Sequence, residues 1–200
     1  MSKSKFVAYG DRGFWAYDVA LGVFLKHLID TAEPLVGSQD NDWLKDAISE
    51  WRIVAVVDPY GLEINRNWSP TQLDVFVNLV GQACNSLAER KAIGFVEIHR
   101  WPILDEYSLD TRGASEVETG PVVELGQAIL GLIDGSLPDP PLGSLWFFGW
   151  PEGRTTILMR NEPSSDNQIS ALQSSVAGSP IARLLGKLRA RIAKALTVGR

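Results

Sequence analysis

The chain has 200 residues, of which 45% are hydrophobic and 22% are charged, and its formal net charge is −5. These values are typical of one globular domain whose core needs no disulfide or metal for stability. The negative charge argues against a general nucleic-acid-binding protein, which is usually basic. One cysteine and two histidines cannot form a disulfide framework or a Cys/His zinc site. Because the common glycine-rich phosphate loops are also absent from the sequence, no cofactor is expected.

No targeting or membrane segment is expected. The apolar stretch after the basic N-terminus is broken by Asp11, Arg12 and Asp18, and no cleavage site of small residues follows. The longest apolar stretch, residues 13–29, contains charged side chains that oppose insertion into a bilayer. The single thiol, Cys84, favours a reducing compartment. We therefore predict a cytoplasmic protein.

The first half of the chain predicts two helices and a hairpin. Apolar residues at helical spacing predict a helix over residues 13–32, and a shorter one is expected over 43–50. The β-branched run at residues 51–57 predicts a strand. A turn at 58–61 leads to a second short strand at 62–64, which completes the hairpin.

The second half predicts two further helices separated by a strand. Ser69 and Pro70 are the N-cap and first residue of the clearest helix in the chain. A third strand is expected over residues 94–100, and a helix over 121–134 that ends at Gly135. An extended connector is expected at 137–143, followed by a hairpin from strands at 145–150 and 155–160.

This pattern predicts an α+β fold. We expect a single domain, residues 1–160, with a largely antiparallel sheet of about four to five strands packed by helices. Residues 161–178 are rich in Ser, Asn and Gln and predict a polar linker, and residues 179–200 predict a basic amphipathic helix. Residues 1–178 hold all 24 acidic and 13 of the 19 basic side chains, whereas 179–200 hold six basic and no acidic ones. The domain is therefore strongly acidic.

Asp18 falls among the apolar residues of the first predicted helix. A buried carboxylate is costly unless it is paired or hydrogen-bonded, and burial favours its neutral, general-acid form. Asp18 is therefore a candidate catalytic or ligand-binding acid. We favour the alternative, a structural acid satisfied by a tryptophan, tyrosine or arginine side chain, or a helix that begins later than residue 13.

Glu97 and His99 alternate onto one face of the strand predicted over residues 94–100. A histidine beside a carboxylate can act as a base and its orienting group where a nucleophile is present. No Gly-x-Ser-x-Gly motif occurs, and Cys84 falls on the core side of its helix. We favour a solvent-facing side of a half-exposed strand, and keep both residues as catalytic candidates.

Residues 105–118 form an acidic stretch with a single basic residue, Arg112. It lacks the oxygen spacing and the glycine of a calcium loop, so no metal site is expected. A negatively charged loop can instead attract a basic protein partner, with Trp101 as an aromatic anchor. The alternative is a solvated loop. The predicted partner-binding residues are Trp101, Asp105, Glu106, Asp110, Glu116 and Glu118.

The predicted helix at residues 179–200 has an apolar stripe and a basic face. Such a helix can make weak contacts with an anionic membrane surface or nucleic acid, or dock in a protein groove. The alternative is packing on the acidic domain. No nucleic-acid contact is expected for residues 1–178.

Two functions from different classes follow. The first is a non-enzymatic protein-binding module, most concretely a small bacterial-type immunity or antitoxin protein that occludes a basic toxin through the acidic loop. The alternative is a small hydrolase that uses Asp18, Glu97 and His99 with Asp105 and Glu106. We favour the first, because the sequence contains no coherent catalytic set.

Overall fold

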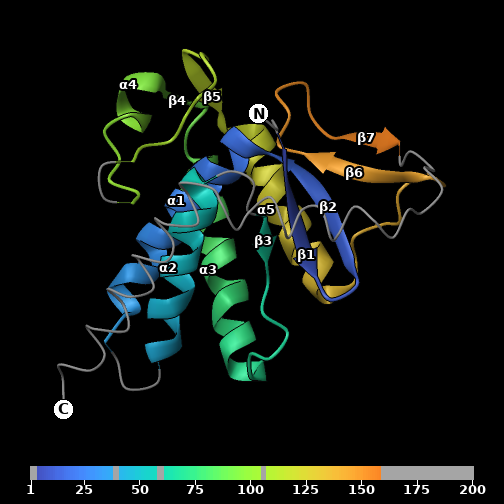
Figure 1. The fold of residues 1–200 in the computed structure, drawn as a ribbon, viewed down its shortest axis with the longest axis horizontal. Coiled ribbons are helices and arrows are strands. Elements are labelled where there is room, and N and C mark those ends of the chain that lie inside the picture. Colours follow the sequence, from blue (N-terminus) through green and yellow to red (C-terminus); the bar gives the residue numbers. More distant parts are fainter. Residues whose placement is uncertain (1–3, 38–40, 58–60, 105–106, 159–200) are drawn as a thin grey trace, which may run out of the picture. The chain divides into compact units, whose positions relative to one another are not determined.

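The structure is a computed structural model that describes residues 4–37, 41–57, 61–104 and 107–158 (Figure 1). Its main sheet has five strands in the order β3-β1-β2-β6-β7. The strands are β1 (Ser4–Tyr9), β2 (Arg12–Tyr17), β3 (Leu62–Glu63), β6 (Ser144–Phe148) and β7 (Thr155–Leu158). The pairs β1–β2 and β6–β7 are antiparallel, whereas β3 joins β1, and β6 joins β2, in parallel. The predicted α+β class is confirmed, and the sheet is mixed.

Helix α1 lies at the centre of the helical layer (Figure 1). The helices are α1 (Asp18–Ala32), α2 (Asp42–Val56), α3 (Pro70–Ala88), the single-turn α4 (Phe95–Ile98) and α5 (Thr119–Asp134), with a 3₁₀ turn at Glu33–Leu35. Helix α1 packs against α2, α3 and α5, and 11 of its 15 residues are buried. Helix α5 also packs against β1, β2 and β6, so it joins the sheet to the helices.

Helices α3 and α5 approach closely at Gly126. A Cβ atom at this position would lie 2.3 Å from the Cys84 sulfur and 2.7 Å from the Phe24 ring. Only glycine therefore allows this crossing. Helix α3 begins as predicted, with Ser69 and Gln72 forming a reciprocal capping box.

The prediction of a helix from residue 13 is wrong, because residues 12–17 form β2. A two-residue turn at Gly10 and Asp11 pairs β2 with β1. Phe14 and Ala16 alternate into the core, so the apolar positions in this segment follow the period of a strand. Because the helix begins at Asp18, this acid occupies the first helical position.

The strand predicted at residues 51–57 is also wrong, since most of it belongs to α2. Buried residues recur along this helix at Leu44, Ala47, Ile48, Trp51, Val54 and Ala55. This 3.6-residue period continues from the predicted 43–50 helix and overrides the strand propensity of the β-branched run. The predicted hairpin is therefore absent, and β3 pairs with β1 instead.

The prediction of a strand at residues 94–100 is wrong, because only Gly94 of that range lies in a strand. That strand is β4 (Ala92–Gly94), which pairs with β5 (Glu116–Glu118) in a small antiparallel sheet. The backbone N–H of Phe95 still donates to Ser115, and the chain then turns into α4. Ile93 and Ile98 are both buried, a spacing of five that a straight strand does not give.

The later elements agree with prediction. Helix α5 ends at Gly135, the segment before β6 is irregular, and β6 and β7 form the expected hairpin. The linker predicted at 161–178 and the basic helix predicted at 179–200 lie outside the described residues, as does the end of the predicted 1–160 domain. Within the described ranges, no helix has the length and apolarity needed to cross a membrane.

Candidate functional site

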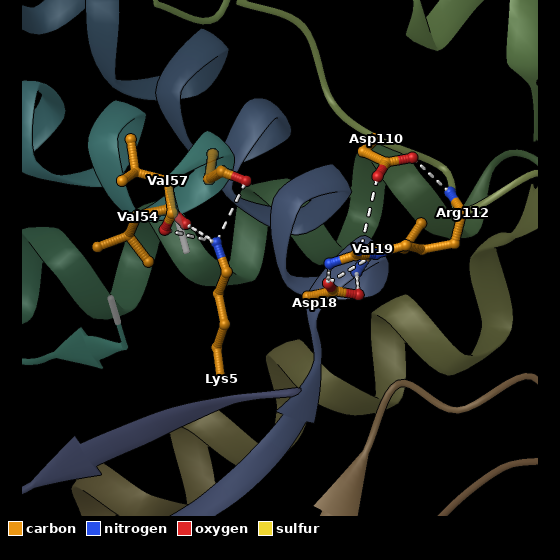
Figure 2. A network of polar contacts seen from close by, with 8 residues as sticks. Lys5, Asp18, Val19, Val54, Val57, Asp110 and Arg112 are labelled. Atoms are coloured by element: carbon orange, nitrogen blue, oxygen red, sulfur yellow. Dashed lines mark hydrogen bonds and ion pairs between the residues drawn. The ribbon is translucent and has the colours of Figure 1, made fainter. Parts of the chain in front are cut away.

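An ion pair between Asp18 and Arg112 joins the start of α1 to the loop that follows α4 (Figure 2). Arg112 donates to Asp18 Oδ2 from Nε at 3.1 Å and from a terminal nitrogen at 2.5 Å. The other oxygen, Oδ1, accepts the backbone N–H of Val19 at 2.8 Å. The side chains are only 9% and 19% exposed. Asp18 is therefore a nearly buried acid whose partner is an arginine, one of the partners expected from the sequence.

The backbone of Arg112 is held in an uncommon conformation. Its φ of 57° is the only positive value at a non-glycine residue in the described part of the chain. Asp110 accepts the backbone N–H of Arg112 at 2.8 Å, and its other oxygen lies 3.6 Å from the guanidinium. The buried Thr111 hydroxyl donates to the Ala114 carbonyl and closes the turn. These contacts fix the strained turn and aim Arg112 at Asp18.

Leu109 anchors the same loop by an apolar contact. It is 4% exposed and packs against Gly22 of α1, where a Cβ atom would lie 2.9 Å from a Leu109 methyl group. Because Gly22 has no side chain, Leu109 can pack directly against the backbone of α1 at the point where the loop crosses the helix. Together with the ion pair, this contact fixes the loop to the first turns of α1.

Lys5 lies near the same network, at the other side of a small cavity (Figure 2). Its ammonium donates to the carbonyls of Val54, Ala55 and Val57 at the C-terminal end of α2, where the helix dipole favours a cation. The cavity measures about 70 Å³. Ligand sites usually measure roughly 300–1,000 Å³, so this cavity is too small for a substrate.

The three catalytic candidates have different partners in the structure. Glu97 accepts two hydrogen bonds of 2.6 Å from Arg90, which lower the pKa of this carboxyl. His99 stacks on Phe95, and its Nδ1 lies 3.3 Å from the hydroxyl of Ser108. The prediction that Glu97 and His99 share a strand face is wrong, because they lie in and just after the helical turn α4. No hydrogen bond in the described ranges joins Asp18, Glu97 and His99 to one another.

The predicted partner-binding acids that the structure describes are on the surface. Glu116 and Glu118 lie on the exposed face of β5, and the side chain of Asp110 is 69% exposed. Neither Glu116 nor Glu118 forms an ion pair with any residue that the structure describes. Asp105 and Glu106 lie outside the described residues.

Trp101, the predicted aromatic anchor, is half-buried beside α1. Its ring meets the His27 ring edge to face at 5.9 Å, and the Lys26 ammonium lies 5.6 Å from its centre. Burial lowers the pKa of His27, although the negative charge of Asp30 acts in the opposite direction. Part of Trp101 therefore packs on the domain, and part remains accessible.

Sequence reasoning missed the roles of Arg112 and Lys5. Arg112 was visible as the single base of an acidic stretch, in a turn-forming sequence next to Gly113. A buried acid needs a partner such as the basic Arg112. The sequence did not show that Asp18 and Arg112 pair, because they lie 94 residues apart. Lys5 gave no such signal, since β1 was not predicted.

The described ranges contain no cluster of three His, Cys, Asp or Glu residues that could hold a metal ion. The chain matches no protein-family model, and comparisons with curated proteins and with solved structures find no match.

Proposed function

We propose that this protein is a non-enzymatic binding module that engages a basic protein partner through an acidic surface formed by Asp110, Glu116 and Glu118. The observation that carries the proposal is that Glu116 and Glu118 are exposed side by side on β5, without an ion pair to any described residue. Unpaired carboxylates of this kind attract cationic partners and orient their approach.

The acidic surface is displayed on a fixed framework. Strand β5 pairs with β4 and continues directly into α5, while the Thr119 amide donates to the Lys91 carbonyl at 3.0 Å. Asp110 is bound to Arg112, which Asp18 anchors. Because these acids are held in place before a partner arrives, little conformational entropy is lost when it binds.

Apolar side chains lie next to the acids, as expected of a protein interface. Glu116 pairs across the small sheet with Gly94, which precedes Phe95 and Val96. These two residues are 42% and 61% exposed. A patch that combines exposed apolar residues with carboxylates suits a protein surface that is both basic and apolar.

The most concrete form of this proposal is a small immunity or antitoxin protein that covers a basic toxin. A cytoplasmic location, favoured by the single Cys84, belongs to the same proposal. The hydrolase alternative lacks support from the geometry, because Asp18 and Glu97 each neutralise an arginine.

Affinity capture from the cells of origin tests the proposal, with the wild type and a Glu116→Lys/Glu118→Lys variant as baits. The wild type should recover a basic protein, and the variant should recover less than about a tenth as much, since two repulsive charges replace two attractive ones. Asp74→Lys, on the exposed side of α3, is the control for a charge change elsewhere. Equal recovery by all three baits would overturn the proposal.

A further inference from the structure

A cavity of about 160 Å³ opens beside β5, between the start of α1, the start of α5 and the turn after β6. Its lining residues are Tyr17, Val19, Ala114, Glu116, Val117, Glu118, Pro121, Gly149 and Pro151. Two of these, Glu116 and Glu118, belong to the acidic surface, and most of the others are apolar. The cavity is thus lined mostly by apolar residues, together with two acidic residues of the exposed face of β5.

The volume of the cavity is that expected of a site for one side chain. Sites for drug-sized ligands usually measure roughly 300–1,000 Å³, whereas an apolar cavity of about 150 Å³ holds a single benzene molecule. A cavity of 160 Å³ therefore has room for one long side chain of a partner.

The apolar lining residues suit an alkyl chain, and the two acidic residues suit a positive charge. Tyr17 is one of the lining residues, and its ring packs edge to face with Trp150 at a centroid distance of 5.0 Å. Burial, and then the negative charge of Asp18, raise the pKa of Tyr17, so that its hydroxyl stays neutral at pH 7. A neutral phenol ring attracts a cation, and its hydroxyl can accept a hydrogen bond from one.

The two carboxylates also favour a cation for an electrostatic reason. Glu116 and Glu118 are two residues apart on the same face of β5, so their negative charges repel each other. A cation between them relieves this repulsion and forms charge-assisted hydrogen bonds. Lysine and arginine are the protein side chains that combine a positive end with an apolar stem.

We propose that this cavity is a socket for one lysine or arginine side chain of the partner, with the stem against Tyr17 and Pro121 and the charge at Glu116 and Glu118. The inference rests on the proposed function and specifies it. According to this inference, the acidic surface contains a pocket that binds one anchoring side chain of the partner. A few such anchoring residues contribute most of the binding free energy in many protein interfaces.

Titration of the full-length protein with small probes, followed by NMR chemical shifts, tests the socket. N-acetyl-lysine methylamide has both the stem and the charge. N-acetyl-norleucine methylamide has only the stem, and N-acetyl-β-aminoalanine methylamide has the charge on a short stem. The lysine probe should bind about tenfold more tightly than either of the others, with shifts at the lining residues. Equal binding of the long and short cations, or no binding of the lysine probe, would overturn the socket.

Matched variants separate the socket from general attraction. Ala114→Phe fills the cavity from an exposed position and should abolish binding of the lysine probe, whereas Ala88→Phe, at the exposed end of α3, should not change it. Glu116→Gln/Glu118→Gln should weaken binding about tenfold, and Glu89→Gln should leave it unchanged. If Ala114→Phe binds the probe normally, the socket is wrong, while the acidic surface is judged separately by the capture experiment.

Discussion

The carboxylate of Asp18 and the guanidinium of Arg112 form a nearly buried ion pair across 94 residues of sequence. This contact connects the first turn of α1 to the loop that leads into β5. The acid that looked most like a catalytic group therefore positions the segment that carries the proposed binding surface. Its removal should affect stability and the loop together.

Asp18→Asn should lower the free energy of unfolding by about 2–4 kcal/mol. Breaking a fully buried ion pair costs roughly 3–5 kcal/mol, and the partial exposure of Arg112 reduces this cost. Urea unfolding measures the loss. Amide hydrogen exchange should also accelerate over residues 107–115, because the loop loses its polar anchor.

Two controls distinguish this pair from ordinary surface charges. Asp110→Asn removes a mostly exposed carboxylate and should cost less than about 1 kcal/mol. Adding Arg112→Met to Asp18→Asn should cost less than the sum of the single changes, since no unpaired charge remains buried. Strict additivity would contradict a direct coupling between Asp18 and Arg112.

Gly126→Ala should destabilise the domain by about 1–3 kcal/mol, because the added methyl group overlaps the Cys84 sulfur at the crossing of α3 and α5. Gly81→Ala is the matched control. It lies in α3 with nothing within 4 Å of an added Cβ atom, so it should stabilise the helix by about 0.5–1 kcal/mol. Thermal or urea unfolding of both variants measures this contrast, and a destabilised Gly81→Ala would contradict the packing described for α3.

Stability should fall on acidification because of His27. Burial lowers the pKa of folded His27, so the unfolded chain, in which histidine has a pKa near ~6.5, binds its proton more readily. The stabilising effect is therefore complete above about pH 6.5 and is lost as the pH falls through the lower, folded-state pKa. Urea midpoints between about pH 7.5 and 5.5 should fall less for His27→Gln than for the wild type, and an equal fall in the two proteins would contradict this role of His27.

Cys84 should react slowly with thiol reagents in the folded protein. Burial raises the pKa of its thiol to about 11, and the side chain is 7% exposed. Since the thiolate is the reactive form, labelling at about pH 8 should be at least roughly a hundredfold slower than in urea. Equal rates in the two conditions would show that α3 does not bury this side chain.

The elements that the sequence predicted well carry both a period and a boundary signal. Helix α3 combines an apolar stripe with a Ser69 cap, and α5 ends at a glycine. The prediction for residues 51–57 was wrong because it relied on their β-branched composition. The helical period of the buried residues, which begins earlier at Leu44, determines the structure. The N-terminal hairpin was not predicted, because the apolar residues of β2 continue directly into those of α1. Residues 13–17 were therefore assigned to the predicted helix.

In the candidate site, too, some features could be predicted from the local sequence and others could not. The exposure of Asp110, Glu116 and Glu118 follows from local composition, and the structure places all three on the surface. The pairing of Asp18 with Arg112 and the cavity beside β5 depend on contacts between distant segments, which local patterns do not encode. The pairing of Glu97 with Arg90 was likewise not predicted, because a strand was expected where the helical turn α4 lies.

The most direct test of the binding module is a calorimetric titration of the captured basic partner with the wild type and with Glu116→Lys/Glu118→Lys. The account predicts that the variant binds at least about tenfold more weakly. It also predicts that the wild type loses affinity between about 50 and 200 mM salt, because exposed charges are screened. Equal affinities of the two proteins, unchanged by salt, would contradict an acidic binding surface on β5.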